Sequence, residues 1–452
     1  MGVLHGVART KSGVPWSVFS NATTGFPSVL CVVSLFIWLI LSAWRIWMKR
    51  RNKKLDERIV TLRQLCGCLF LMGCIVVYVA ICERGIGRLV NPLFTWVGFS
   101  IITIVCIIMN SLWTHPVSKP GPMNCDLTNE IKGWMQALIV AYHYLGGYGV
   151  LPIYILMRIF VSTYVTLSGF GHFLFYWNKF SPKVFLRMNF LNISLCLSLR
   201  QPYLLHYFVG LISYCYTVVA ITMTFWLALT QLFIAISKSV NEKSKIPAPL
   251  GWALQSVEGE WLARWSLDRY SSQFGLLCGF IFAQCKQRWK FTNESSTKSN
   301  SDRSYKMRTG LFFGTGIGVI AVYICYFSVT TNHSTYVKWH PYLCFIPITA
   351  IIILRNITAF GRNHASVFFS WFGAFALELF ILQYHILLTR NMRKVFLVFT
   401  KSRIINGLII TPCFVTVSYW THLLTQDICN IILPPHDFFP KPPPNLQKVP
   451  SN

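Results

Sequence analysis

The sequence predicts an all-α fold, a polytopic membrane bundle with roughly 10–13 helical spans. Hydrophobic residues make up 54% of the 452 residues, charged residues make up 12%, and the mean hydropathy is +0.50. Apolar runs of spanning length recur along the chain, and Lys and Arg gather in the short segments between them. A soluble chain would need more polar surface, and a bilayer accepts only helices or closed barrels. The lipid bilayer is therefore the first expected partner.

The spans are predicted from apolar runs, each of which needs about 20 residues to cross the hydrocarbon layer. The run 203–236 is long enough for one tilted span or for two, and the short run 274–283 is compatible with a re-entrant segment. The complete set is 29–47, 64–82, 93–113, 134–149, 151–170, 184–199, 203–236, 274–283, 311–329, 342–354, 366–388 and 404–424.

The net charge of +27 resembles that of nucleic-acid-binding proteins, but the distribution of the charge argues against nucleic acid as a partner. The basic residues flank spans, as the positive-inside rule describes, and two blocks stand out at 49–58 and 286–308. Placing both blocks in the cytosol makes the N-terminus lumenal. The sequons at Asn21 and Asn332 then become lumenal glycosylation sites.

Domain organisation follows from the same pattern. We expect a lumenal tail at 1–27, a multi-spanning domain at 28–430 and a Pro-rich tail at 431–452. The first apolar run has full span length and is followed by positive charge, so it is predicted to be an anchor. The fifteen cysteines lack the spacing of a metal site, and we predict no metal.

Glu378 and His385 interrupt the apolar run 366–388. An ionisable group at bilayer depth costs at least ~2.5–3.5 kcal/mol, so each needs a partner or a watery cavity. Seven residues apart on one helix, the two side chains share a face, and Trp371 lies on the same stripe. One interpretation is a polar seam between helices. The other is a proton-handling pair, in which an imidazole beside a carboxylate serves as a general base.

A second polar stripe is predicted on the helix that contains Lys132, Gln136 and His143, which fall on roughly one face. Lys132 and Trp134 fit interfacial anchors. His143 lies deeper, where a role as an anchor explains it poorly.

Buried cations form a third group. Arg158 lies in the middle of an apolar run and needs an anion, either a carboxylate such as Glu378 or a phosphate of a bound cofactor. Arg187 lies near a span end, where an ordinary positive flank would explain it. Glu260, Arg264 and Asp268 have the spacing of an interfacial amphipathic helix with internal ion pairs.

An acid, several histidines and arginines at membrane depth suit acyl transfer from an anionic donor, and they suit a proton-coupled carrier equally well. Six segments resemble, in order, the multi-spanning sugar O-acetyltransferases, which include the sialate O-acetyltransferases, the fungal capsule O-acetylation proteins and the plant reduced-wall-acetylation proteins. The segments are EIKGWMQALIVAYHY, RIFVSTYVTLSGFGHFLFYW, RMNFLNISLCLSL, LDRYSSQFGLL, HPYLCFIPITAIIILRN and LELFILQYH.

The resemblance implies a multi-pass Golgi protein that takes acetyl from cytosolic acetyl-CoA for O-acetylation of lumenal glycans such as sialic acid. We expect His143 or His385 to act as base or transient acetyl acceptor, Glu378 to orient an imidazole, and Arg158 to stabilise an oxyanion or a phosphate. Residues at matching positions and expected to contact the donor are Lys132, Gln136, Arg187, Asn189, Asp268, Arg269, Arg355 and Gln383.

One departure from the family bears on its chemistry. The sialate members carry a lumenal esterase-like domain ahead of the spans, and residues 1–27 hold no such motif. We therefore expect a separate lumenal transferase as partner, as in the plant proteins. The alternatives are a carrier of acetyl-CoA or protons, and a non-catalytic scaffold.

Overall fold

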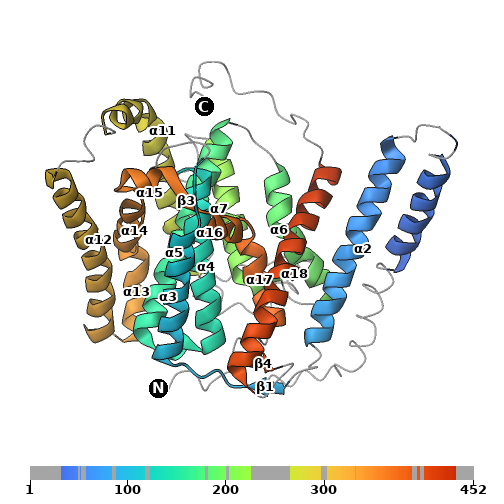
Figure 1. Ribbon diagram of the computed structural model, residues 1–452, viewed down its shortest axis with the longest axis horizontal. Coiled ribbons are helices and arrows are strands. Elements are labelled where there is room, and N and C mark those ends of the chain that lie inside the picture. Colours follow the sequence, from blue (N-terminus) through green and yellow to red (C-terminus); the bar gives the residue numbers. More distant parts are fainter. Residues whose placement is uncertain are drawn as a thin grey trace, which may run out of the picture.

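The computed structural model describes residues 32–48, 51, 57–83, 88–117, 123–178, 182–199, 203–224, 265–296, 303–330, 332–388, 394–397 and 402–433. Figure 1 shows a helical bundle with α16 and α17 near its centre and with α12 and α2 at opposite sides. A helix over Val32–Met48 precedes α2. The helices are α2 (Glu57–Glu83), α3 (Trp96–Leu112), α4 (Cys125–Leu145), α5 (Leu151–Asn178), α6 (Pro182–Leu199), α7 (Tyr207–Thr224), α11 (Ser271–Ser296), α12 (Arg303–Thr330), α13 (His333–Leu343), α14 (Phe345–Asn356), α15 (Ala359–Asn363), α16 (Val367–Ala374), α17 (Ala376–Ile386) and α18 (Arg403–Ile432), with short 3-10 turns η1 (Gly147–Gly149) and η2 (Tyr203–His206).

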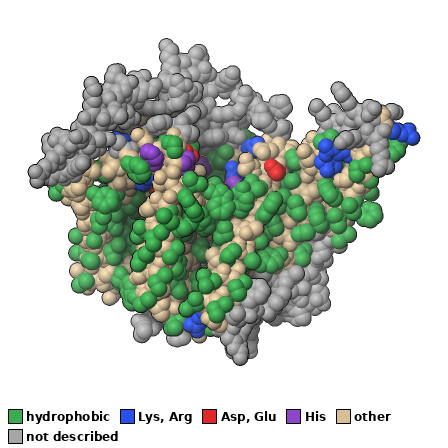
Figure 2. All heavy atoms as spheres, in the orientation of Figure 1, with side chains coloured by type: hydrophobic (Ala, Val, Ile, Leu, Met, Phe, Trp, Pro, Cys, Tyr) green, Lys and Arg blue, Asp and Glu red, His purple; other side chains and the backbone are tan. Residues whose placement is uncertain are grey.

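The predicted all-α membrane fold is confirmed. Among the described residues, four helices are long and apolar enough to cross a bilayer, or six if each of two bent helix pairs counts as one span. Figure 2 shows hydrophobic side chains covering most of the visible face as a broad band. Exposed apolar residues such as Ile107, Leu311 and Ile404 belong to this outer surface. Such a surface is stable against lipid and would be unstable in water.

Two antiparallel ribbons tie the ends of the bundle together. The strands β1 (Arg88–Val90) and β4 (Val395–Leu397) pair at one end, with Leu89 opposite Phe396. At the other end β2 (Thr114–Pro116) pairs with β3 (His364–Ser366), with His115 opposite Ala365. Figure 1 shows the first ribbon at the bottom of the view and β3 near the top.

Bent helix pairs carry polar residues into the interior. The pair α13 and α14 bends by 58° around Cys344, and α16 and α17 bend by 70° around Phe375. The second break separates Trp371 from Glu378, so the predicted continuous stripe from Trp371 through His385 is wrong. A break exposes backbone groups that a helix would satisfy, and such breaks in membrane bundles occur where the chain is enclosed by protein.

Glycines allow the closest helix contact. A Cβ atom at Gly133 of α4 would lie 2.1 Å from the carbonyl oxygen of Phe369 of α16. A Cβ atom at Gly373 would lie 1.9 Å from the carbonyl oxygen of Asn129. Small residues at matching positions let two membrane helices approach backbone to backbone. This contact fixes α16, and hence the break before α17, against α4.

Other predicted spans changed their limits. The run 274–283 forms part of the 26-residue helix α11 and is not an isolated short segment. The run 203–236 contains η2 and α7, and its remainder lies outside the described residues. The starts of α2 and α12, which border the basic blocks, lie at the upper end of Figure 1, opposite the junction of α12 and α13. Asn21 lies outside the described residues.

Candidate functional site

Glu378 lies in the first turn of α17, directly after the break at Phe375. Its Oε1 atom is 3.0 Å from Nδ1 of His422 on α18, and the two side chains are 6% and 7% exposed. A carboxylate accepts hydrogen bonds only, so Nδ1 of His422 donates. The lone pair of a neutral His422 is therefore at Nε2.

Arg187 of α6 is the third member of this site and contacts the same imidazole. Its guanidinium nitrogen lies 2.9 Å from Nε2 and 3.2 Å from Nδ1 of His422. The guanidinium is always charged and only donates, so it donates to the Nε2 lone pair. Glu378, His422 and Arg187 are called the carboxylate site below. The site places one imidazole against one carboxylate and one guanidinium.

His385 lies seven residues after Glu378 and contacts a different imidazole. Its Nε2 atom is 3.0 Å from Nε2 of His206 in η2, and both side chains are fully buried. Nδ1 of His206 lies 2.7 Å from Oδ1 of Asn192, whose Nδ2 donates to the carbonyl of Tyr203 at 3.2 Å. That second bond fixes the orientation of the amide, so His206 donates to it through Nδ1. His206 and His385 are called the histidine pair.

Neighbouring side chains hold α6, η2 and α7 in place around the histidine pair. The hydroxyl groups of Tyr203 and Ser213 both donate to Oδ1 of Asn189, the latter at 3.0 Å. Nδ2 of Asn189 donates to the carbonyl of Phe185 at 2.9 Å. Asn189, predicted to contact the donor, is thus bound within the protein.

Arg158 has a carboxylate partner, as expected, but the partner is Asp268 and not Glu378. The guanidinium lies 2.5 Å from Oδ2 of Asp268, and both side chains are buried. Asp268 sits just before α11, and its ion pair runs to α5 rather than along an amphipathic helix. Glu260 and Arg264 lie outside the described residues. Arg269 is exposed and donates to the Tyr342 hydroxyl at 2.9 Å.

The stripe on α4 faces the interior. Nζ of Lys132 lies 4.9 Å from the ring centre of Tyr164, and Trp134 packs edge-on against Phe160 at 5.1 Å. Both contacts are to α5, so the interpretation of Lys132 and Trp134 as interfacial anchors is wrong. His143 is partly buried near the end of α4, against the ring of Tyr142 at 4.9 Å.

Two buried glutamines have amide atoms that find no hydrogen-bond partner among the described residues. Gln383 of α17 is fully buried and neither of its amide atoms has a partner. Nε2 of Gln136 on α4 is also unpaired. An unpaired buried amide is unfavourable by about 1–3 kcal/mol, which identifies both positions as candidates for contact with a bound group.

Arg355 is bound within the protein. Nε and Nη2 of Arg355 donate to both carboxylate oxygens of Glu130 at 3.1 and 2.7 Å. Oε2 of Glu130 also accepts from the backbone N–H of Ser366 at 2.9 Å. This bidentate pair joins α14, α4 and β3, a structural connection rather than the predicted donor contact.

Four polar residues of the interior were not predicted from the sequence. In the sequence, His206, His340 and His422 each stand apart from other histidines, and Ser162 is one of several hydroxyl residues in α5. None has a motif of its own, because each depends on a partner from another helix. His422 lies one residue after Thr421 in an otherwise ordinary span, and only its contact with Glu378 distinguishes it.

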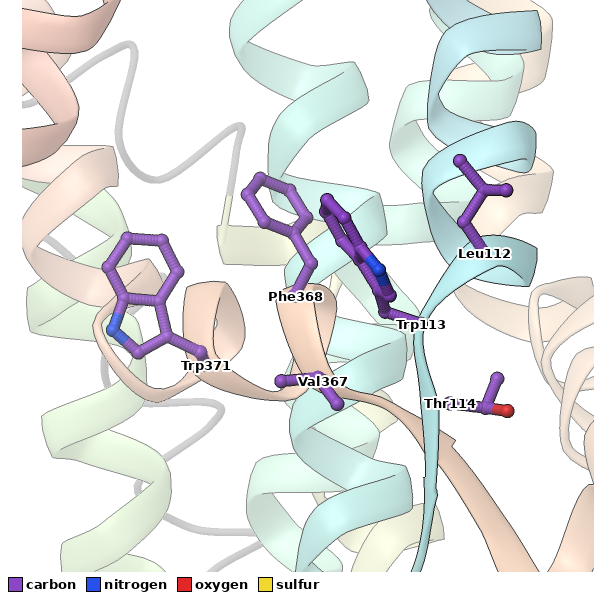
Figure 3. A pocket seen from close by; sticks show the side chains of 6 residues that line it. All are labelled: Leu112, Trp113, Thr114, Val367, Phe368 and Trp371. Carbon is purple, nitrogen blue, oxygen red and sulfur yellow. The ribbon is translucent and has the colours of Figure 1, made fainter.

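A hollow of about 500 Å³ lies between α3 and α16, lined by Leu112, Trp113, Thr114, Val367, Phe368 and Trp371. Figure 3 shows that its walls are aromatic and aliphatic. None of the titratable residues of the carboxylate site or the histidine pair lines it. A hollow of this composition suits hydrocarbon and has no group for acid–base chemistry.

Comparison with known proteins identifies the family of the chain. A family model described as the 10 TM acyl transferase domain found in Cas1p matches residues 18–246 and 249–439. The chain is similar to a Danio rerio protein named N-acetylneuraminate (7)9-O-acetyltransferase, with 30% identity over 396 residues that cover 80% of this chain and 50% of the relative. The chain thus spans about half the length of that relative. No solved structure matches the chain.

These matches cover most of the bundle, including α4, α5, α17 and α18, and they confirm the resemblance seen in the sequence. The chain belongs to the family of membrane acyltransferases that share the 10 TM acyl transferase domain of Cas1p.

Proposed function

We propose that this chain is the membrane core of an O-acetyltransferase. It takes acetyl from cytosolic acetyl-CoA and makes it available at the lumenal face of the Golgi membrane for O-acetylation of glycans such as sialic acid. The carboxylate site carries this proposal, because it holds an imidazole in contact with both a carboxylate and a guanidinium inside the bundle. A base that is held by a carboxylate can activate a nucleophile for acyl transfer.

Arg187 connects donor binding with the base. It is partly exposed near the start of α6, and it occupies the Nε2 lone pair of His422. The phosphates of acetyl-CoA compete for a guanidinium through bidentate, charge-assisted bonds. Binding of the CoA moiety would therefore draw Arg187 away and release the base only when the donor site is occupied.

The histidine pair would act further along the path of the acetyl group. Glu378 and His385 are seven residues apart, about 10 Å along the axis of α17. Figure 1 shows α17 descending from the centre of the bundle toward the β1 and β4 end. This end also contains the junction of α12 and α13. The carboxylate site thus lies nearer the basic blocks and the donor, and the histidine pair lies nearer the acceptor, whether a glycan or a separate lumenal transferase.

The test uses the full chain in proteoliposomes, with acetyl and CoA carrying different labels. The proposal predicts that acetyl reaches an acceptor on the opposite face while CoA stays on the donor face. Passage of both labels together would identify a carrier. Lack of movement of either label, in protein that still binds a lumenal transferase, would identify a scaffold. His115→Gln is a control, because His115 lies in β2, away from both sites.

A further inference from the structure

A second buried polar cluster joins α5, α13 and the turn before α11. It consists of Tyr336, His340, Ser162, Asp268 and Arg158, and it is called the Ser162 cluster. Ser162, His340 and Tyr336 are 0% exposed, Asp268 is 1% exposed and Arg158 is 6% exposed. The cluster lies outside the carboxylate site and the histidine pair, so neither site accounts for it.

The hydrogen positions in this cluster follow from the contacts. The single hydroxyl hydrogen of Ser162 is donated to Oδ1 of Asp268 at 2.5 Å, because a bond to a carboxylate is stronger than a bond to an imidazole. Oγ of Ser162 is also 2.9 Å from Nε2 of His340, and that contact therefore needs its hydrogen from Nε2. Nδ1 of the neutral ring then accepts from the hydroxyl of Tyr336 at 2.7 Å.

All three bonds point in one direction, from Tyr336 through His340 and Ser162 to Asp268. We propose that the Ser162 cluster is a proton relay that carries a proton from the acceptor side of the bundle to Asp268 during acetyl transfer. Tyr336 gives its proton to Nδ1 of His340 and receives the proton that the acceptor hydroxyl releases. His340 gives its Nε2 proton to Ser162, and Ser162 gives its own to Asp268. Asp268 becomes neutral, which weakens its ion pair with Arg158.

The proposal rests on the proposed function, whose chemistry requires such a proton. The acceptor hydroxyl loses a proton when its oxygen bonds to the acetyl carbon, and the thiolate of CoA gains one when the carbon–sulfur bond breaks. The two events occur toward opposite ends of the bundle. A proton that moves inward from the acceptor side and is released from Asp268 to the departing thiolate balances the transfer without net charge.

Burial distinguishes a relay from a covalent acyl site. A serine beside an imidazole is also the pattern of a nucleophile and its base. Ser162 has no exposed surface, however, and its hydroxyl is bonded on both sides, whereas a proton needs only the existing bonds. The position of α13 supports proton movement from the acceptor side toward Asp268. Exposed His333 begins α13 beside Asn332, and Tyr336 and His340 follow at one and two helical turns.

The other groups around Asp268 are consistent with its carboxylate being the last proton acceptor of the relay. Among the described residues, the titratable groups that interact with Asp268 are Arg158, Tyr336, Cys215 of α7 and Cys344 between α13 and α14. Tyr323 of α12 offers a second hydroxyl to Nδ1 of His340 at 3.3 Å. Arg158 is the sole permanent cation among these groups.

The experiment measures proton arrival directly, without an acyl donor. The full chain in liposomes receives a rapid drop in external pH, and carboxyl protonation is followed by time-resolved infrared spectroscopy. The Asp268 band is identified by its loss in Asp268→Asn. We expect Ser162→Ala to lower the rate at which this band appears by ~10²-fold, the lower end of the range for a positioned proton carrier. Thr163→Val is the matched control, because Thr163 is equally buried and donates to the Ile159 carbonyl at 2.7 Å. His340→Gln interrupts the series of hydrogen bonds at a second position, and it serves as the test if Ser162→Ala fails to fold.

Acetyl transfer is then measured in the same liposomes. Slower protonation of Asp268 together with slower acetyl transfer in Ser162→Ala or His340→Gln supports the relay. Slower protonation in a protein that moves no acetyl, even as wild type, supports the relay and rejects the proposed function. Wild-type protonation kinetics in Ser162→Ala and His340→Gln overturn the relay. Unchanged transfer despite slow protonation also overturns it, because the relay would then serve no step of the reaction.

Discussion

Oε1 of Glu378 lies 3.0 Å from Nδ1 of His422, across the contact between α17 and α18. The contact places a carboxylate against an imidazole directly after the 70° break that begins α17. The first turn of a helix has a partial positive charge, which favours an ionised carboxylate. Local structure thus sets the position of Glu378 at the start of α17, and long-range packing supplies its partner from α18.

Loss of either imidazole of the histidine pair should slow acetyl movement strongly. His385→Gln and His206→Gln remove the contact between the two Nε2 atoms, which are 3.0 Å apart. We expect each to slow transfer by ~10²–10⁴-fold, the usual contribution of a positioned acid or base. Transfer of labelled acetyl in proteoliposomes is the measurement, with His115→Gln as control. A wild-type rate in His385→Gln would reject any role of this residue as base or acyl carrier.

Arg187 variants should separate donor binding from chemistry. Arg187→Ala removes a charged contact to the donor, typically ~1.5–3 kcal/mol, so KM for acetyl-CoA should rise roughly 10–100-fold. The change in kcat should be smaller, since Nε2 of His422 loses a competing donor. Arg187→Lys keeps the charge without the planar fork and should be intermediate. An unchanged KM in Arg187→Ala would place the donor elsewhere.

The glycine contact between α4 and α16 should control stability. Gly133→Ala and Gly373→Ala place a Cβ atom about 2 Å from a facing carbonyl oxygen, and such overpacking is destabilising by about 1–3 kcal/mol. Thermal unfolding in detergent measures the effect. Gly171→Ala is the control, because its Cβ atom would meet nothing within 4 Å. Equal midpoints for Gly133→Ala and Gly171→Ala would contradict the packing described for α4.

The pair of Glu130 and Arg355 should contribute stability rather than catalysis. Glu130→Gln removes the charge that receives the bidentate bonds of Arg355, and breaking one side of a buried ion pair is destabilising by about 3 kcal/mol. The unfolding midpoint should fall, while the KM of the folded protein for acetyl-CoA should stay unchanged. A raised KM with an unchanged midpoint would restore Arg355 to the donor site.

Composition predicts the helical membrane bundle, because the bilayer restricts the backbone so strongly. The sequence also identifies Glu378 and His385 as costly residues that need partners. It does not identify those partners, since His422 and His206 belong to helices 44 and 179 residues away in the chain. Arg158 illustrates the same limit: its need for a carboxylate is local, and the choice of Asp268 over Glu378 depends on how α5 packs near α11.

The central claim is that Glu378 and His422 act as one unit in acetyl transfer. The most direct test is a double-mutant cycle on single-turnover acetyl transfer from acetyl-CoA, with Glu378→Gln, His422→Gln and the double variant. The claim predicts that each single variant loses ~10²-fold or more and that the double variant loses little further, because residues that act together are non-additive. Wild-type rates in both single variants, or fully additive losses, would contradict it.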